Sequence, residues 1–308
     1  MVPSKSVLTG YLHPAYASSF AALGVPRQLA ASGGWLIERQ IRGSDTERDA
    51  MGCYPLFACQ NWSGLEHDCE EIGGDLVAVS LVSDPFGQYT AEQLRAVFPD
   101  VCRPFKEHFV VDYTRPLQSP SAGHRRNLRL AQGLVEAEVV VDPIRLSSDW
   151  VSLYQCLVER HEIRGIPAFS PASLVQQLSV PGLTMFRAVY REQTVGITLW
   201  YANENAAYYH LGAYNKTGYA VRASFALFDH AIRHFRERVR CLLLGAGAGT
   251  SANSLDGLTR FKRGWANGTR TAWLCGRIFN VDRYNDLAAK RRLGSANYFP
   301  IYRAGEFS

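Results

Sequence analysis

The stretch 242–265, LLLGAGAGTSANSLDGLTRFKRGW, passes from an apolar run through a glycine-rich turn into a basic, aromatic cluster. A dinucleotide-binding fingerprint needs G-x-G-x-x-G between a strand and a helix, with an acidic residue about 20 positions later. Here Thr250 occupies the position of the third glycine, and the stretch comes late in a segment rich in antiparallel strand patterns. We therefore reject a nucleotide cofactor site, and the basic end needs another explanation.

The composition is that of a folded, globular chain. Its 308 residues are 47% hydrophobic, enough for one large core or two of ordinary domain size, and we expect two. The start, MVPSKSVLTGYLHP, has no apolar signal-peptide core, and no apolar run approaches the roughly 20 residues that a membrane-spanning helix needs. We therefore expect a soluble, cytoplasmic protein without a membrane span.

The cysteines and the net charge limit the kinds of site that the sequence predicts. The seven cysteines form no C-x-x-C pair and have no histidine at zinc spacing, so we predict reduced, mostly buried thiols and no metal site. A catalytic cysteine is the alternative, and it would require a thiol whose pKa is lowered. No G-x-S-x-G motif supports Ser-His-Asp catalysis. The net charge of +5 permits a phosphorylated partner without requiring one.

The first half alternates strand and helix patterns. Apolar runs with β-branched and aromatic residues predict strands at 34–41, 53–60, 76–82 and 107–113. Helical patterns lie at 64–72 and 91–98. A polar, proline-containing stretch follows at 114–131, and we place the domain boundary just after it, giving domains over 1–140 and 141–308.

The second half has a definite order of elements. Capping residues predict helices at 147–165 and 170–178. Three runs joined by short polar turns predict an antiparallel meander over 183–190, 193–201 and 206–214. The remaining predictions are a helix at 221–238, strands at 241–245 and 271–279, and a C-terminal helix from about 280 to 293.

This order resembles the GNAT acyltransferase fold over about half the chain. In that family the donor's pyrophosphate lies against backbone amides after the fourth strand, in a Q/R-x-x-G-x-G/A motif. The aligned residues here are Asn215, Gly218 and Ala220, with Asn in place of Gln or Arg. Glycine allows close approach, and a helix N-terminus attracts anions. An ordinary strand-to-helix turn is the alternative.

The whole stretch 242–265 resembles the Fem family of non-ribosomal peptidyl transferases, whose second domain carries a Phe-Lys pair in the same setting. The resemblance implies an α/β (α+β) fold of two GNAT-like domains in tandem, each a mixed, mainly antiparallel sheet flanked by helices. It implies that Lys262 stabilises the oxyanion formed as an amine attacks an acyl carbonyl, and that Phe261 packs against the donor end. The alternative is a solvated cationic face of Arg260, Lys262 and Arg263.

Other residues of the second half are weaker candidates. His161 could take the proton of the attacking amine, or could be favoured at its helix C-terminus by the dipole. Tyr208 and His210 lie two apart on one strand and so share a face, toward the acyl group or toward the core. The catalytic candidates are Lys262, His161 and Tyr208. The donor-binding candidates are Phe261, Arg263, Asn215, Gly218, Ala220 and His210.

Acceptor binding is assigned to the first domain, at loops that end predicted strands. Trp62, Asp84 and Phe86 are candidates there, although SDPFG around Asp84 is also ordinary turn sequence. Arg164, in the second domain, is a further acceptor-binding candidate. The basic run 124–129, HRRNLR, could meet phosphate on tRNA or on a nucleotide-linked acceptor, or could be a solvated helix face.

These features predict a Fem-like N-acyltransferase of the GNAT superfamily. It would transfer an aminoacyl or acyl group from an activated donor to an amine of a small peptide, amino sugar or metabolite. We expect no tightly bound cofactor and no DNA partner, with aminoacyl-tRNA favoured as the co-substrate. The alternatives are an acyl-CoA-dependent N-acetyltransferase and a non-catalytic GNAT-like binding module, since fold alone does not establish activity.

Overall fold

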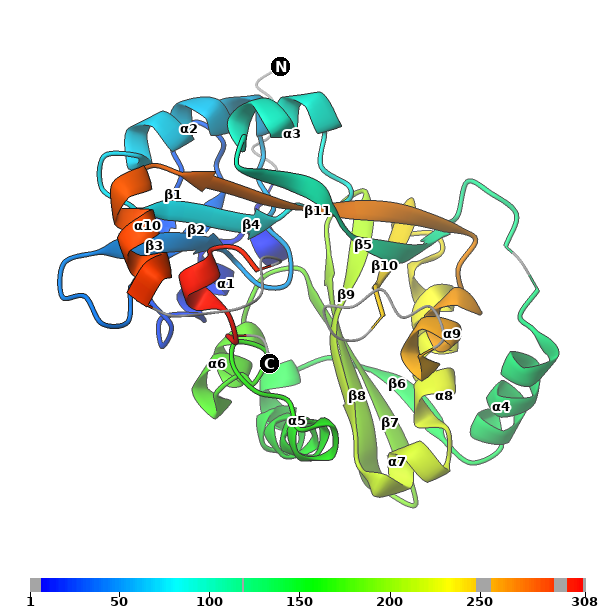
Figure 1. Cartoon of the computed structure of the whole chain (residues 1–308). Coiled ribbons are helices and arrows are strands. Elements are labelled where there is room, and N and C mark those ends of the chain that lie inside the picture. Colours follow the sequence, from blue (N-terminus) through cyan, green and yellow to red (C-terminus); the bar gives the residue numbers. More distant parts are fainter. Residues whose placement is uncertain (1–6, 118, 248–255, 291–297, 307–308) are drawn as a thin grey trace. The chain divides into compact units, whose positions relative to one another are not determined.

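The chain folds into two compact units, and each unit is assembled from separate segments. The computed structural model describes residues 7–117, 119–247, 256–290 and 298–306. Unit 1 comprises residues 1–10, 106–163 and 170–270, whereas unit 2 comprises 11–105, 164–169 and 271–308. These units differ from the predicted boundary after residue 140, because one late strand, at 268–278, pairs within the unit that the N-terminal half begins (Figure 1).

The sheet of unit 1 is mixed and mainly antiparallel. Its strand order is β5-β10-β9-β8-β7-β6, and only the β10–β9 pair among these neighbours is parallel. The strands are β5 (Val101–Asp112, of which 106–112 belong to unit 1), β6 (Glu136–Val140), β7 (Leu183–Tyr190), β8 (Gln193–Ala202), β9 (Ala206–Tyr214) and β10 (Cys241–Gly245).

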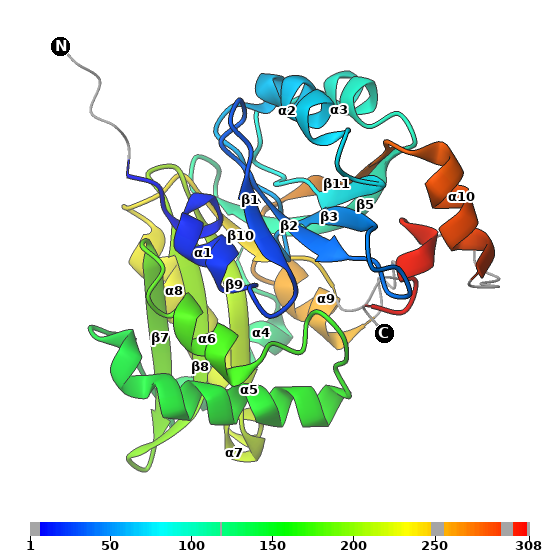
Figure 2. The ribbon, with the colours of Figure 1, turned by 90° about the vertical axis from the view of Figure 1, so that its left-hand side faces the viewer.

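Helices cover both faces of this sheet. Helix α5 packs on β8 and β9, while α8 packs on β6 to β9 from the other side (Figure 2). The α8 face holds a large apolar cluster that includes Trp200, Phe228 and Phe235. The helices of unit 1 are α4 (Ala122–Gln132), α5 (Ser147–His161), α6 (Pro171–Gln177), α7 (Lys216–Ala220), α8 (Ala223–Phe235) and α9 (Gly257–Arg263).

The strands of unit 2 are likewise mixed and mainly antiparallel. Their order is β1-β2-β3-β4-β11, and only β3–β4 is parallel among these neighbours. The strands are β1 (Val25–Gln28), β2 (Trp35–Gln40), β3 (Arg48–Gly52), β4 (Ala78–Val82) and β11 (Gly268–Ile278, of which 271–278 belong to unit 2). The helices are α1 (Pro14–Ser18), α2 (Leu65–Ile72), α3 (Ala91–Val97) and α10 (Val281–Lys290).

A buried ion pair fixes the C-terminal segment of unit 2. The Arg303 guanidinium donates to both carboxylate oxygens of Asp49 on β3, each at 2.9 Å. Both side chains are buried, and such a bidentate pair fixes geometry as well as charge. Residues 298–306, which contain Arg303, are therefore part of this unit's structure.

The predicted fold class, mixed and mainly antiparallel strands flanked by helices, is confirmed. The meander of the second half and its helices occur where the sequence predicts them. The predicted strand at 53–60 is wrong: this segment forms only an isolated bridge between Phe57 and Ser83, and Pro55 has no N–H to donate. Strands β1, β3 and β6 and helices α1, α7 and α9 were not predicted, since they are short.

The described residues carry free cysteines and no metal-binding cluster. Burial raises the pKa of the Cys53 and Cys69 thiols to about 12, which disfavours the reactive thiolate. Within the described ranges, no group of three or more His, Cys, Asp or Glu side chains could hold a metal ion. No helix in these ranges is long and apolar enough to cross a membrane.

Candidate active site

The site centres on Lys262, which lies near the end of the short helix α9. This helix begins after Asp256, whose side chain caps it by accepting a hydrogen bond from the Thr259 amide at 2.8 Å. Lys262 is only 5% exposed, and its ammonium Nζ donates to the carbonyl oxygen of Ala246 at 2.7 Å. The alternative of a solvated cationic face therefore does not describe this lysine, whereas its neighbour Arg263 is exposed.

The glycine-rich turn accommodates this arrangement. Gly245 has φ +81°, in the left-handed region, and a Cβ there would lie 2.8 Å from Lys262 Nζ. A Cβ at Gly247 would lie 2.2 Å from the hydroxyl of Thr259. The glycines that resemble a dinucleotide turn thus make room for a buried lysine and for the cap of its helix; residues 248–255 lie outside the described residues.

Burial tunes the charge of Lys262. It lowers the pKa of the ammonium from 10.5 to about 7, with Asp256 opposing and Lys106 reinforcing the shift. Lys106 lies on β5, with its Nζ 3.5 Å from the carbonyl oxygen of Gly247. Burial also lowers the pKa of His108 to about 3, as do the charges of Lys262 and Lys106. Lys262 is therefore a cation that can lose its charge near neutral pH.

Aromatic packing fixes α9 beneath the lysine. The Phe261 ring lies 4.7 Å from Phe228 and 5.0 Å from Phe225, both on α8. Lys262 Nζ stands 5.3 Å from the centroid of the Tyr209 ring on β9, a cation–π contact. In this structure Phe261 is a core anchor of α9, so the direct packing of its ring on a donor remains a prediction.

A second helix is attached to α9 through His124. The imidazole Nε2 of His124, on α4, lies 2.9 Å from the carbonyl oxygen of Phe261, and its ring stacks at 5.9 Å on the Phe261 ring. Gly264 permits this approach, because a Cβ there would lie 2.1 Å from the imidazole. The sequence singled out the basic run that contains His124, but its attachment to the lysine helix follows only from the tertiary fold.

We expect His124→Ala to lower the free energy of unfolding by about 1–3 kcal/mol, because it removes a hydrogen bond and leaves space among aromatic rings. The measurement is urea unfolding of the full chain. His67→Ala, at an exposed position on α2, serves as the control and should change stability by less than about 0.5 kcal/mol. Equal effects of the two substitutions would contradict the attachment of α4 through His124.

No known protein family and no curated protein matches the sequence. Several solved structures are similar to this chain in fold. FemX is 11% identical over 92% of this chain and 94% of that chain, with a TM-score of 0.64. L-PGS from Bacillus licheniformis is 15% identical over 89% and 94%, with a TM-score of 0.56. The C-terminal domain of a putative lysylphosphatidylglycerol synthetase from Agrobacterium fabrum is 16% identical over 87% and 88%, with a TM-score of 0.59.

The chain has a Fem-like fold. The likeness extends over most of its length and over most of each compared structure, so it covers both units. The Fem-like fold therefore accounts for the first half of the sequence, for which no sharp motif is visible, as well as for the second.

Within this Fem-like fold, Tyr208 and His210 are not on the side of Lys262. They flank Tyr209, the residue that contacts the lysine, and adjacent residues of a strand point to opposite faces. His210 Nε2 lies 3.0 Å from the side-chain oxygen of Gln177 on α6, and its ring lies 4.8 Å from Tyr201. Burial lowers the pKa of His210 to about 3, so this imidazole is neutral near pH 7.

The predicted donor loop forms a different group. Asn215 caps α7 by accepting a hydrogen bond from the Gly218 amide at 2.8 Å, and a Cβ on Gly218 would lie 2.0 Å from the Val195 carbonyl oxygen. Ala220 is exposed. His161 lies beside this loop, with Nε2 3.5 Å from the Tyr219 hydroxyl, and burial lowers the pKa of its imidazole.

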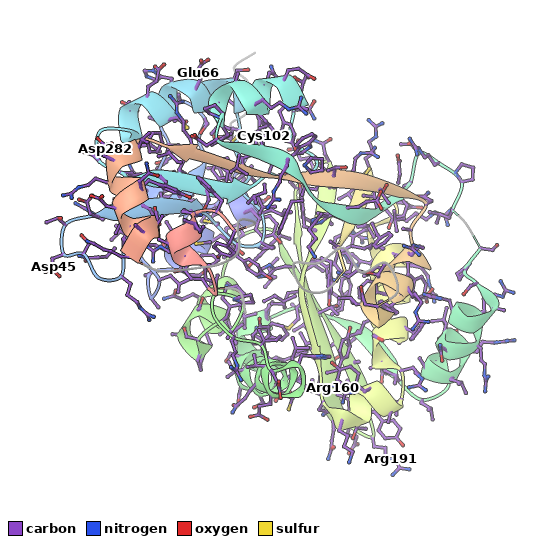
Figure 3. All side chains as sticks on the ribbon, viewed as in Figure 1. Asp45, Glu66, Cys102, Arg160, Arg191 and Asp282 are labelled. Atoms are coloured by element: carbon purple, nitrogen blue, oxygen red, sulfur yellow. The ribbon has the colours of Figure 1, made fainter. Side chains whose placement is uncertain are left out.

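The charges around this loop are of both signs. The guanidinium of Arg160, labelled in Figure 3, stands 4.1 Å from the Tyr219 ring. A hollow nearby is lined by the carboxylate of Asp149 together with Thr194 and Asn215. Thr194 donates to this carboxylate at 2.5 Å. The structure thus groups His161 with Asn215 and Gly218, at a place in unit 1 separate from the surroundings of Lys262 described above.

The acceptor candidates lie in unit 2. Trp62 is buried against Phe57 and Tyr89, with ring centroids at 5.8 Å and 4.4 Å. The Asp84 carboxylate accepts a hydrogen bond from the Phe86 amide at 2.9 Å, the turn geometry that its sequence also predicts. Arg164 is exposed in the short segment 164–169. Their role in acceptor binding remains a prediction.

Proposed function

We propose that this chain is an N-acyltransferase that moves an aminoacyl group from aminoacyl-tRNA to an amine of a small peptide, amino sugar or metabolite. The observation that carries the proposal is the buried Lys262 ammonium, fixed at 2.7 Å on the Ala246 carbonyl within a Fem-like fold. A preorganised cation in a water-poor site is the kind of group that acyl transfer needs.

In the proposed reaction the acceptor nitrogen attacks the carbonyl carbon of the aminoacyl ester. The carbonyl oxygen becomes an oxyanion, which the Lys262 ammonium stabilises without being consumed. As the new carbon–nitrogen bond is completed, the carbon–oxygen ester bond breaks. The amine loses a proton and the released ribose oxygen gains one, so the step needs no oxidant, reductant or metal. The rate acceleration then comes from positioning the amine against the ester and from stabilising the charge of the oxyanion.

The geometry of the predicted CoA loop favours tRNA over acyl-CoA as the donor. The Gly218 amide, which would meet a pyrophosphate, already donates a hydrogen bond to the Asn215 side-chain oxygen. The adjoining hollow is lined by the Asp149 carboxylate, which repels phosphate. Exposed arginines instead lie on α9 itself, at Arg260 and Arg263.

The donor is tested by native mass spectrometry of the purified chain offered acetyl-CoA and a mixture of charged tRNAs together. We expect a tRNA complex and no CoA complex. A CoA adduct alone would overturn the proposed donor and favour the acetyltransferase alternative. Neither complex would favour the non-catalytic alternative.

The rate of transfer should depend on pH in a direction that the lysine sets. Only the protonated ammonium stabilises an oxyanion, and its pKa is about 7. We therefore expect the single-turnover rate, measured with an acceptor that does not titrate in this range, to fall as the pH rises through about 7. A rate that rises steadily with pH up to about 9 would instead indicate that Lys262 acts as a neutral base.

A further inference from the structure

We infer that helix α4, together with the exposed side of α9, is the docking surface for the phosphate backbone of a tRNA acceptor stem. This inference rests on the proposed function and goes beyond it, because it assigns the partner's binding surface outside the reacting site. The surface is defined by five exposed arginines: Arg125, Arg126, Arg129, Arg260 and Arg263.

The charge of these two helices is of one sign. Neither 122–132 nor 257–263 contains an aspartate or a glutamate. Among the residues that the structure describes, none of the five arginines forms an ion pair, whereas Arg233 on the neighbouring α8 pairs with Asp229. Their guanidinium groups are thus not neutralised within the fold, although Arg125 donates to a backbone carbonyl and Arg263 stands over the Phe109 ring.

The surface is held at a fixed place beside the candidate site. His124 joins α4 to the carbonyl of Phe261, the residue before Lys262, and α4 also packs on α8. In Figure 1, α4, α8 and α9 lie side by side in the same unit. An aminoacyl ester at Lys262 would therefore bring the last part of its tRNA to the arginines of α4 and α9.

The chemistry of the surface fits a polyphosphate backbone. A guanidinium binds phosphate through two parallel N–H bonds and keeps its charge at every physiological pH. Arg125 and Arg129 lie four residues apart, about 6 Å along the helix axis, with Arg126 beside them, so together with the arginines of α9 they can meet more than one phosphate. A small acceptor with one or two phosphates would not use them all, so an RNA backbone is the partner that we choose.

The test is the binding of unfractionated, deacylated tRNA, followed by fluorescence anisotropy at several KCl concentrations. The α4 variant carries three substitutions, Arg125→Gln, Arg126→Gln and Arg129→Gln. We expect its affinity to fall at least about tenfold. The slope of log K against log salt should become shallower by about 0.7–0.9 for each phosphate that the variant no longer neutralises. Thermal unfolding of the same variant checks that it is folded.

A control variant removes the same charge elsewhere. It carries Arg42→Gln, Arg145→Gln and Arg191→Gln, all at exposed positions outside the surface; Arg191 lies at the β7–β8 turn (Figure 3). We expect its tRNA affinity to change less than about twofold, since exposed charges that do not touch the phosphates act only through attraction that salt screens. Equal losses of affinity in the two variants would overturn the assignment of the surface.

The outcomes separate this inference from the proposed function. If the wild-type chain transfers from aminoacyl-tRNA but the α4 variant binds tRNA as the wild type does, the surface is wrong and the function stands. If the wild-type chain binds no tRNA, both fail. If the α4 variant binds tRNA normally but loses binding to vesicles of phosphatidylglycerol, the surface is a lipid-binding one and the inference is overturned.

Discussion

Lys262→Met is expected to lower kcat for acyl transfer by about 10²–10³-fold, since one positioned donor to an oxyanion contributes about 3 kcal/mol to lowering the barrier. Methionine keeps much of the side-chain volume but can neither carry the charge nor donate to the Ala246 carbonyl. The measurement is single-turnover transfer at saturating donor and acceptor. Lys290→Met, at an exposed position on α10, is the matched control and should retain full activity.

Measuring the free energy of unfolding against pH distinguishes a catalytic role of Lys262 from a structural one. Because the pKa of this lysine is lowered from 10.5 to about 7, the unfolded chain binds more protons than the folded chain between these values. The free energy of unfolding should therefore rise with pH across this window, and the Lys262→Met variant should lose that rise. The proposed role would be contradicted if the Lys262→Met variant kept full activity, or if this variant unfolded globally below pH 7.

Gly245→Ala is expected to lower kcat by about 10–100-fold and the free energy of unfolding by about 1–3 kcal/mol. The residue has φ +81°, which an alanine adopts only with strain, and the new methyl would lie 2.8 Å from Lys262 Nζ. The lysine must then leave the position in which it meets the reacting ester. Transfer rates and urea unfolding of the same preparation measure both effects.

Gly257→Ala provides the control for that substitution. Gly257 is the first residue of α9, and a Cβ there meets nothing within 4 Å. The same chemical change should therefore leave activity intact and leave stability unchanged or slightly higher, because alanine favours helix more than glycine does. If both glycine variants behave alike, the turn is not a specific support for the lysine.

The sequence located the Phe-Lys cluster because it is one continuous motif, and the structure shows what surrounds it. Lys106 and His108 lie on a strand about 150 residues earlier in the chain, so no local pattern connects them with Lys262. A feature that could have pointed to them is their spacing, because residues two apart on a strand share one face. Tyr208 and His210 were predicted to face either the acyl group or the core, and strand alternation places their neighbour Tyr209 against the lysine instead.

The fold was predictable where contacts are local. The meander over 183–214 is joined by short turns, so strand order follows chain order, and that part is confirmed. The composition of the two units was not predictable, because it depends on pairing across long distances. β11 pairs with β4 from Leu274 opposite Val82 to Ile278 opposite Ala78. A boundary drawn at a polar stretch in the sequence has no access to such pairing.

This discontinuity sets the order in which the protein can fold during synthesis. Unit 1 is complete once residue 270 has left the ribosome, but unit 2 still lacks β11 and the segment whose Arg303 binds Asp49. Domains fold as units while the chain is made. The unit that is begun first is therefore finished last, and until β11 has been made its strand β4 has an edge that lacks the partner it pairs with in the folded chain.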